Sequence, residues 1–344
     1  MRKILVMFVM AVVIAATVIG AGCTGNGDSG DAGSSDLKEL NFGYQPSTHQ
    51  IAYMTAMKKG WWDEAIQPYG YTTDPEKNEI QFPTGAPEMQ AMLAGEIDVA
   101  YVGSAPVISA LSTGLDAKIV AAVQTQGSAL VLQPDIEYNS PEDLKGLTIS
   151  TFPTGTIQDT ILREWLASNG LTVGENTKAG EVDILPMGPG DAVTAMTAGQ
   201  IDGTFLPSPS PTMLVEEGHG KIVEWSGSMM PNHPCCVLVV SDRLIEENPD
   251  LVTALVKTHI RATDYDLAHP DEAAQTYADY TKNTLEVAQD SIANWDGTWT
   301  ADPNQIVDGV MDYVSVQEEL GYIDNPLTED QIFDLSFYEK ATSA

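Results

Sequence analysis

The chain has 344 residues, with 16 Lys or Arg against 49 Asp or Glu and a net charge of −33. Nucleic acid and anionic membrane surfaces are poor partners for so acidic a protein, so we expect neither as a ligand. If an N-terminal segment containing Arg2 and Lys3 is removed, 14 basic residues remain against 49 acidic ones, a net charge of −35. Three arginines are then left, Arg163, Arg243 and Arg261, so an arginine cluster cannot hold an anionic ligand.

The N-terminus is typical of an export signal. Arg2 and Lys3 precede an uncharged apolar run, residues 4–19, which is short for a membrane span. The run leads into Gly20-Ala21-Gly22-Cys23, which resembles the lipobox of bacterial and archaeal lipoproteins. We predict a signal peptide over residues 1–22 and a lipid on Cys23 that anchors the protein to the outer face of the cytoplasmic membrane. The alternative is an uncleaved N-terminal membrane anchor, and both place the remaining chain outside the cytoplasm.

Residues 24–36 consist of Gly, Ser, Asp and Asn with almost no apolar side chain. Such a segment cannot bury enough surface to fold, so residues 23–36 are predicted to be the lipidated Cys and a flexible tether. The remaining residues are sufficient for two lobes with cores of their own.

Strands and helices alternate after the tether. The first strand is predicted over residues 40–44, with a helix over 49–59 that ends at Gly60. A strand over 79–82 and a helix over 86–94 follow, and Gly95 ends that helix. Further strands are predicted over 97–102, 118–124 and 129–132. Short connections between alternating strands and helices predict open, mostly parallel α/β sheets.

The pattern then restarts after a helical turn at Ser140. Strands are predicted over 147–151, 182–185 and 201–206, with helices over 156–169 and 191–198 between them. An apolar strand is predicted over 236–241. After it we expect only helices, over 250–268, 270–280, 285–294 and 307–321, packed back onto the first lobe.

Two segments of the chain repeat. The stretch APEMQAMLAGEIDVAYVGSAP (residues 86–106) corresponds to PGDAVTAMTAGQIDGTFLPSPS (189–210), with an offset of 104 between Ala94 and Ala198. YQPSTHQ (44–50) likewise corresponds to TFPTGTIQ (151–158), with Pro46 matching Pro153. A near-constant offset predicts two similar lobes. A cleft between lobes is a common place for a small ligand.

The turns at the strand ends carry small and hydroxyl residues that lead into helix N-termini. These ends present free N–H groups and a partial positive charge, so several of them facing one cleft can bind an oxyanion without Arg or Lys. The alternative for any single turn is ordinary helix capping. The candidate ligand-binding residues are Ser47, Thr48, His49, Thr84, Gly85, Ala86, Ser104, Ala105, Thr154, Gly155, Thr156, Gly188, Gly190 and His233.

Several motifs together resemble one family. They are GYQPS followed by a helix ending in KKGWW, then AGEIDVAYVGSAP, DLKGLTISTFPTGT and QEELGYI. They are similar to the extracytoplasmic solute-binding proteins of ABC importers, in the nitrate, sulfonate and taurine branch, over residues 40–327. The resemblance implies a type II periplasmic-binding-protein-like fold of two α/β lobes joined by two crossing strands. It implies ligand contacts from loops 46–49, 84–86, 103–106 and 154–156, and as partners a small anionic solute, a permease and its ATPase.

Aromatic and histidine side chains bear on the choice of ligand. Tyr44 and Phe152 end corresponding strands and are expected to face the cleft, whereas Trp61 and Trp62 are expected to pack under the first helix. His233, just before the second crossing strand, is a candidate polar contact.

Enzyme signatures are missing from the sequence. The five His show no metal spacing and no nucleophile turn occurs, so we expect no catalysis, cofactor or metal. Asp98 and Asp202 occupy equivalent places and are expected to be structural. Cys235 and Cys236 are interpreted as buried apolar residues, with a strained disulfide as the alternative.

We therefore predict a monomeric binding protein for a small organic anion such as a sulfonate, taurine or nitrate. Residues 37–125 and 237–344 are expected to form lobe 1, and residues 126–236 to form lobe 2. One alternative changes the ligand to a heteroaromatic vitamin precursor of the thiamine pyrimidine or flavin type. The other is an exported enzyme on the same fold, which would need a His and Cys set in the cleft.

Overall fold

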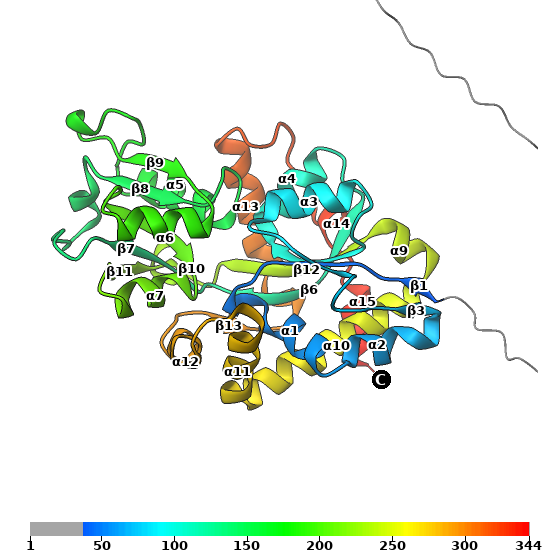
Figure 1. The fold of residues 1–344 in the computed structure, drawn as a ribbon. Helices are drawn as coiled ribbons and strands as arrows, with labels where there is room; N and C mark the ends of the chain where they lie inside the picture. The colour runs from blue at the N-terminus through cyan, green and yellow to red at the C-terminus, as the bar shows by residue number, and fades with distance from the viewer. Residues whose placement is uncertain (1–36, 344) are drawn as a thin grey trace, which may run out of the picture. The chain divides into compact units, whose positions relative to one another are not determined.

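The computed structural model describes residues 37–343, so the predicted signal peptide, Cys23 and the tether lie outside the described part of the chain. Within residues 37–343, no helix is both long enough and apolar enough to cross a membrane. These residues form two α/β lobes, each built around one sheet, as Figure 1 shows.

The first lobe contains a six-stranded sheet in the order β13-β6-β12-β5-β2-β4. Its strands are β2 (Phe42–Tyr44), β4 (Glu79–Gln81), β5 (Val99–Gly103), β6 (Ala117–Thr125), β12 (Pro234–Ser241) and β13 (Thr298–Trp299). A separate parallel pair joins β1 (Lys38–Glu39) to β3 (Tyr71–Thr72). The helices of the first repeat are α1 (Ile51–Lys58), α2 (Trp61–Ile66), α3 (Gly85–Leu93) and α4 (Ser104–Ser112).

The second lobe contains a five-stranded sheet in the order β11-β7-β10-β8-β9. Its strands are β7 (Ser128–Leu132), β8 (Thr148–Thr151), β9 (Asp183–Pro186), β10 (Gly203–Pro207) and β11 (Lys221–Trp225). Its helices are α5 (Ile157–Ser168), α6 (Pro189–Thr197), α7 (Ser210–Glu216) and α8 (Ser226–Met229).

The duplication seen in the sequence is a duplication of topology. In the first lobe β2 lies between β5 and β4, and in the second β8 lies between β10 and β9, with parallel pairing throughout both trios. Each trio is extended by an antiparallel strand, β12 beside β5 and β7 beside β10. The repeats therefore place corresponding turns at corresponding edges of two similar sheets.

The prediction of mostly parallel sheets was wrong. Strands β6, β7, β11, β12 and β13 all pair antiparallel to their neighbours, so both sheets are mixed. The connections explain the error. Strand β6 is followed by β7 after residues 126–127, and only the four-residue helix α8 separates β11 from β12. Both connections between the lobes are therefore too short for the long crossover that parallel strands require.

The prediction of an all-helical tail was also wrong, because β13 adds an edge strand to β6. The other tail elements are α9 (Asp242–Glu247), α10 (Pro249–Ala268), α11 (Pro270–Thr281), α12 (Leu285–Ala293), α13 (Val307–Glu319), α14 (Glu329–Ile332) and α15 (Ser336–Thr342). Helix α10 packs on α1, α2 and β6 of the first lobe, whereas α12 contacts α7 and α13 contacts both α4 and α5. The tail therefore contacts both lobes (Figure 1).

Buried aromatic rings fix the first lobe. Phe42 contacts Tyr53 and Trp62 at centroid distances of 5.7 and 5.2 Å, and Tyr101 lies 5.2 Å from Tyr53. Trp62 thus packs under α1, as expected, while Trp61 lies against Arg261 at the surface. The core holds the ends of β2 and β5 rigidly beside the cleft.

Candidate functional site

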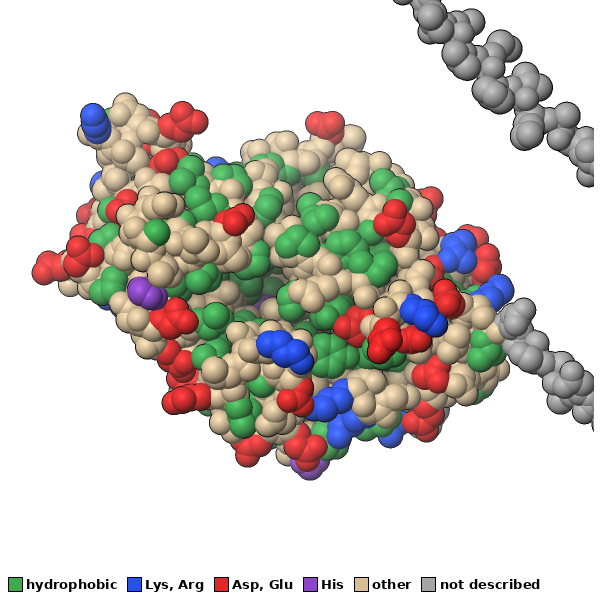
Figure 2. All heavy atoms as spheres, viewed as in Figure 1, with side chains coloured by type: hydrophobic (Ala, Val, Ile, Leu, Met, Phe, Trp, Pro, Cys, Tyr) green, Lys and Arg blue, Asp and Glu red, His purple; other side chains and the backbone are tan. Residues whose placement is uncertain are grey.

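A pocket of about 220 Å³ lies between the lobes. The space-filling view shows this face of the molecule hollowed between them (Figure 2). The first lobe contributes the end of β2, the loop before α3, the start of α4 and the start of β12. The second contributes the starts of α5, α6 and α7. The lining residues are Gln45, Pro46, Ser47, His49, Gln81, Pro83, Gly85, Gly103, Pro106, Phe152, Thr156, Ile157, Gln158, Pro189, Pro207, Ser208, Pro209, Ser210, Cys235 and Cys236.

Four helices of eight residues or more begin at this pocket. Gly85 is the first residue of α3, Gly103 is the N-cap of α4, and Thr156 is the N-cap of α5. Pro189 is the first residue of α6. Two of these helices come from each lobe. Their unpaired N–H groups and positive dipole ends favour a negatively charged or strongly accepting ligand.

No Lys, Arg, Asp or Glu is among the residues that line the pocket. Arg163 is instead paired with the buried carboxylate of Asp159, its Nε 2.7 Å from Oδ1. Asp159 is satisfied further by the Tyr322 hydroxyl at 2.6 Å and the Gly155 N–H at 3.2 Å. Polar recognition in this pocket therefore comes from neutral donors and from the helix ends.

Neutral amides and hydroxyls supply the polar part of the lining. Gln158 donates to the Ser128 hydroxyl at 3.0 Å, which fixes its amide. Gln45 donates to the carboxyl of Glu88 at 2.8 Å, and burial raises the pKa of Glu88 well above its usual range. The Ser208 hydroxyl is buried at the pocket wall and has no hydrogen-bond partner among residues 37–343. An unpaired buried hydroxyl is costly, so Ser208 is suited to bind a polar ligand.

The structure separates the predicted site residues into three groups. Ser47, His49, Gly85 and Thr156 line the pocket. A second cavity, beside α3 and α4, is lined by Ala86, Thr154, Gly155 and again Thr156. The residues that line neither cavity are Thr48, Thr84, Ser104, Ala105, Gly188, Gly190 and His233. Thr48 and Ser104 are buried beside lining residues in the sequence, and both hydroxyls lack a partner within the described chain.

His233 is buried and is not among the residues that line the pocket. Its Nδ1 lies 2.9 Å from the Tyr313 hydroxyl and 3.1 Å from the Pro234 carbonyl. Burial lowers its pKa to about 4, so the ring is neutral. His233, predicted as a ligand contact, thus connects the start of β12 to α13 in the described structure.

Only one of the two strand-end aromatics faces the cleft as expected. Phe152 lines the pocket. Tyr44 packs on Tyr53 at a centroid distance of 4.8 Å and on Tyr280 at 6.5 Å, inside the first lobe. The expectation for Tyr44 was wrong because α11 covers this end of β2.

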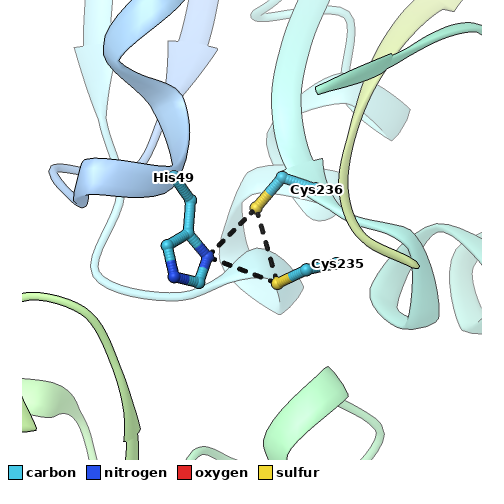
Figure 3. Close-up of side chains that lie close together, drawn as sticks. All are labelled: His49, Cys235 and Cys236. Carbon is cyan, nitrogen blue, oxygen red and sulfur yellow. Dashed lines mark hydrogen bonds between the residues drawn. The ribbon is translucent and has the colours of Figure 1, made fainter. Parts of the chain in front are cut away.

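A cluster of soft donors forms part of the pocket wall, as Figure 3 shows. The Nδ1 atom of His49 lies 3.3 Å from Sγ of Cys235 and 3.9 Å from Sγ of Cys236. The two sulfur atoms are 3.9 Å apart, and both thiols are free. The hydrogen bond between the two thiols, together with burial, raises the pKa of Cys235. The same hydrogen bond, with contributions from His49 and Gln50, lowers the pKa of Cys236.

Sequence spacing failed to reveal this cluster. The reasoning from local motifs finds no metal spacing, but His49 reaches Cys235 across 186 positions of the chain. The His and Cys set that the enzyme alternative requires is thus present in the cleft. Ser208 and Ser210 were also missed. The duplication contains the signal for Ser208, because an offset of 104 from Ser104 leads to it.

Known proteins share this fold and sequence pattern. The chain is 25% identical over 307 residues to an aliphatic sulfonates-binding protein of Bacillus subtilis, covering 89% of this chain and 88% of the relative. It is 24% identical over 236 residues to a formylaminopyrimidine-binding protein of Halalkalibacterium halodurans, covering 67% of this chain and 66% of that protein.

Among solved structures, the alkanesulfonate-binding protein SsuA from Xanthomonas axonopodis pv. citri, bound to MOPS, superposes with a TM-score of 0.74. It is 17% identical, and the match covers 87% of this chain and 99% of that one. The likeness shows the two-lobed binding-protein fold. Residues 33–280 match the model of the NMT1-like family, which is more than half of the chain, and the protein belongs to that family.

Proposed function

We propose that this protein is the extracytoplasmic solute-binding component of an ABC importer and that it captures a small organic anion, such as a sulfonate, between its lobes. The observation that carries the proposal is the convergence of the N-termini of α3, α4, α5 and α6 on a pocket without Lys or Arg. A sulfonate presents three acceptor oxygens, which N–H groups and hydroxyls can satisfy. The apolar lining, with Phe152 and Ile157, suits its organic part.

Capture would proceed by closure of the two lobes on the solute. We assign residues 37–125 and 237–344 to lobe 1 and residues 126–236 to lobe 2. A solute that touches both lobes stabilises the closed state, because it gains contacts there that the open state lacks. Gly103 supports close approach of the lobes, since a Cβ atom at this position would lie 3.2 Å from the Ile157 side chain.

The protein would not convert its solute chemically. It would deliver the solute to a permease driven by an ATPase. The names of the relatives describe binding proteins, which supports this reading. The thiols and His49 in the pocket are the residues on which an enzymatic alternative would depend. A candidate solute can be incubated with the protein and analysed by mass spectrometry. Detection of a chemically altered product would contradict the proposal.

A thermal-shift and calorimetry panel tests the solute class. The panel contains aliphatic sulfonates, taurine, nitrate, and pyrimidine and flavin compounds. We expect the sulfonates to bind with a stoichiometry of one. The heteroaromatic alternative is favoured by Phe152 at the pocket wall, on which a ring could stack. Binding of a pyrimidine in preference to every sulfonate would establish that alternative.

The protein would be a monomer held on the outer face of the cytoplasmic membrane by a lipid on Cys23. Cys23→Ser is expected to leave the precursor unprocessed or to release the protein from membranes. Fractionation with metabolic lipid labelling measures both. Unchanged processing, labelling and membrane retention in this variant would show that Cys23 is not the anchor.

A further inference from the structure

The search for a second activity leads to His49, Cys235 and Cys236. Their donor atoms form a triangle with edges of 3.3, 3.9 and 3.9 Å. A tetrahedral Zn²⁺ with Zn–S of about 2.3 Å and Zn–N of about 2.0 Å separates its ligand atoms by about 3.5–3.8 Å. The triangle therefore needs shifts of only a few tenths of an ångström to bind such an ion. All three side chains are buried, yet all three line the pocket.

The hydrogen bonds of His49 prepare its ring for a metal. The other ring nitrogen, Nε2, lies 2.9 Å from the carbonyl oxygen of Gly127. A carbonyl can only accept, so Nε2 carries a proton, and in that tautomer the lone pair is on Nδ1, facing the sulfur atoms. Histidine ligands of metals characteristically donate their second N–H to a carbonyl or carboxylate in this way. Gly127, with φ +85°, permits the approach, because a Cβ atom there would lie 2.9 Å from Nε2.

The backbone of β12 brings the two thiols to the same side. Adjacent residues of a regular strand point to opposite faces of a sheet, so neighbouring cysteines cannot normally share a ligand. The pairing of β12 with β6 is irregular between Pro234 and Cys236 and again between Cys236 and Val237. Such irregularities redirect side chains and are common beside functional sites. Here both sulfur atoms approach the same nitrogen of His49 (Figure 3).

We propose that His49, Cys235 and Cys236 form a zinc site with three protein ligands and a fourth position open to the pocket. Two thiolates neutralise the charge of Zn²⁺, whereas a Cu⁺ ion would leave a net negative charge in a buried wall that has no Lys or Arg. Three protein ligands with one open position are the arrangement of zinc sites that bind a further molecule. The proposal does not depend on which organic solute the pocket binds, because all three ligands are residues of the chain.

A titration with cobalt(II) tests the site while His49, Cys235 and Cys236 are all unchanged. The full chain carrying Cys23→Ser, solubilised in mild detergent, is reduced, stripped of metal and titrated with CoCl₂ without oxygen. We expect one equivalent of Co²⁺ to produce thiolate-to-cobalt charge-transfer absorption and the intense visible bands of tetrahedral cobalt, and ZnCl₂ to abolish both. Zn²⁺ should also protect Cys235 and Cys236 from alkylation, as measured by mass spectrometry. Absence of thiolate-to-cobalt absorption, or undiminished alkylation, would overturn the proposal.

Variants then identify the ligands. Cys235→Ser and Cys236→Ser should each weaken Zn²⁺ binding by more than roughly 100-fold, beyond the effect of losing an outer-shell partner. His49→Gln should also weaken it and should shift the cobalt spectrum. The exposed His269→Gln is the matched control and should bind as the parent does. Thermal unfolding without metal confirms that each variant is folded. Equal affinity in the parent and in a folded Cys235→Ser variant would overturn the assignment, as would Cu⁺ binding with no Zn²⁺ binding.

Discussion

Ser104 and Ser208 occupy equivalent positions in the two repeats, and neither hydroxyl has a partner among residues 37–343. Ser208→Ala should therefore weaken solute binding by about tenfold, or about 1.4 kcal/mol, because a donor to the anion is lost. Stability should barely change, since no internal hydrogen bond is removed. Calorimetry and thermal unfolding measure the two quantities, with the exposed Ser168→Ala as control.

Ser104 is buried and does not line the pocket, whereas Ser208 does, so Ser104→Ala should cost less affinity than Ser208→Ala. Thr154 lines the second cavity, so Thr154→Ala should behave as the control does, although the sequence makes Thr154 a candidate ligand-binding residue. Arg163→Gln should lower the melting temperature, because it leaves the buried carboxylate of Asp159 without its ion pair. It should have little effect on solute binding. Loss of binding in Arg163→Gln alone would show that an ion pair holds the solute.

Asp266 is a buried carboxyl on α10 whose effect on stability depends on pH. Its Oδ1 accepts a hydrogen bond from Thr55 at 2.7 Å, and burial raises its pKa to about 7. An unfolded Asp titrates near pH 4, so between pH 4 and 7 the folded state binds more protons and stability falls as the pH rises. The cost accumulates at about 1.4 kcal/mol per pH unit and is complete above pH 7.

Asp266→Asn removes this titration and keeps an acceptor for Thr55. The free energy of unfolding of the variant, relative to wild type, should rise by about 2–3 kcal/mol between pH 5 and pH 7. Urea denaturation at the two pH values measures it, with the exposed Asp264→Asn on the same helix as control. A difference that is the same at both pH values would show that Asp266 is already ionised in the fold.

At the scale of elements, α13 connects the two lobes. Gln317 near its end donates to the carbonyl of Ala105 in the first lobe at 3.1 Å and to that of Gly155 in the second at 3.3 Å. The Ser109 hydroxyl donates back to its Oε1 at 3.2 Å. Because Gln317 binds both lobes at once, these hydrogen bonds stabilise the arrangement of the lobes seen in the structure.

Gln317→Ala should therefore shift the protein toward an open state and lower solute affinity by about three- to tenfold, corresponding to about one net hydrogen bond. The exposed Ser315→Ala on the same helix should change nothing. Small-angle scattering should show a larger radius of gyration for ligand-free Gln317→Ala than for wild type, and compaction of both with solute. Equal radii and equal affinities would exclude a role for α13 in closure.

Most elements of the repeats could be predicted from local signals. Gly60, Gly95 and Gly170 end helices at positive φ, as expected from their places after apolar periodic segments. Strand pairing could not be predicted in the same way, because direction depends on how the chain crosses between lobes. The edge strand β13 is two residues long and has no periodicity to detect.

The same distinction between local signals and long-range contacts applies to the residues of the candidate site. Turns that open helices are visible in sequence, and Ser47, Gly85 and Thr156 were found that way. The donor cluster was not, because it joins the 3₁₀ turn before α1 to an irregular part of β12. The contact between His233 and Tyr313 could not be predicted either, because the two residues lie 80 positions apart.

At the scale of the whole molecule, charge opposes the proposed ligand. The chain carries a net charge of −33, yet we propose that the pocket binds an anion through local N–H groups. Repulsion of an approaching anion acts over distances comparable to the Debye length, about 10 Å at 0.1 M salt, whereas hydrogen bonds at contact are screened much less. Salt should therefore act on association more than on dissociation.

The association rate constant of an anionic sulfonate should rise severalfold between about 10 mM and about 0.2 M NaCl, with a nearly constant dissociation rate. Stopped-flow tryptophan fluorescence measures both, aided by Trp295, whose ring lies 5.4 Å from that of His49 at the pocket wall. A zwitterionic aminosulfonate has no net charge, so its association rate should be nearly independent of salt. As a control, the titration is repeated with a salt of a bulky organic anion. This control distinguishes screening of the protein's charge from competition by chloride for the pocket. If the association rate of the anion falls with salt instead, the field at the pocket mouth is attractive, and neutral helix ends are not the main source of recognition.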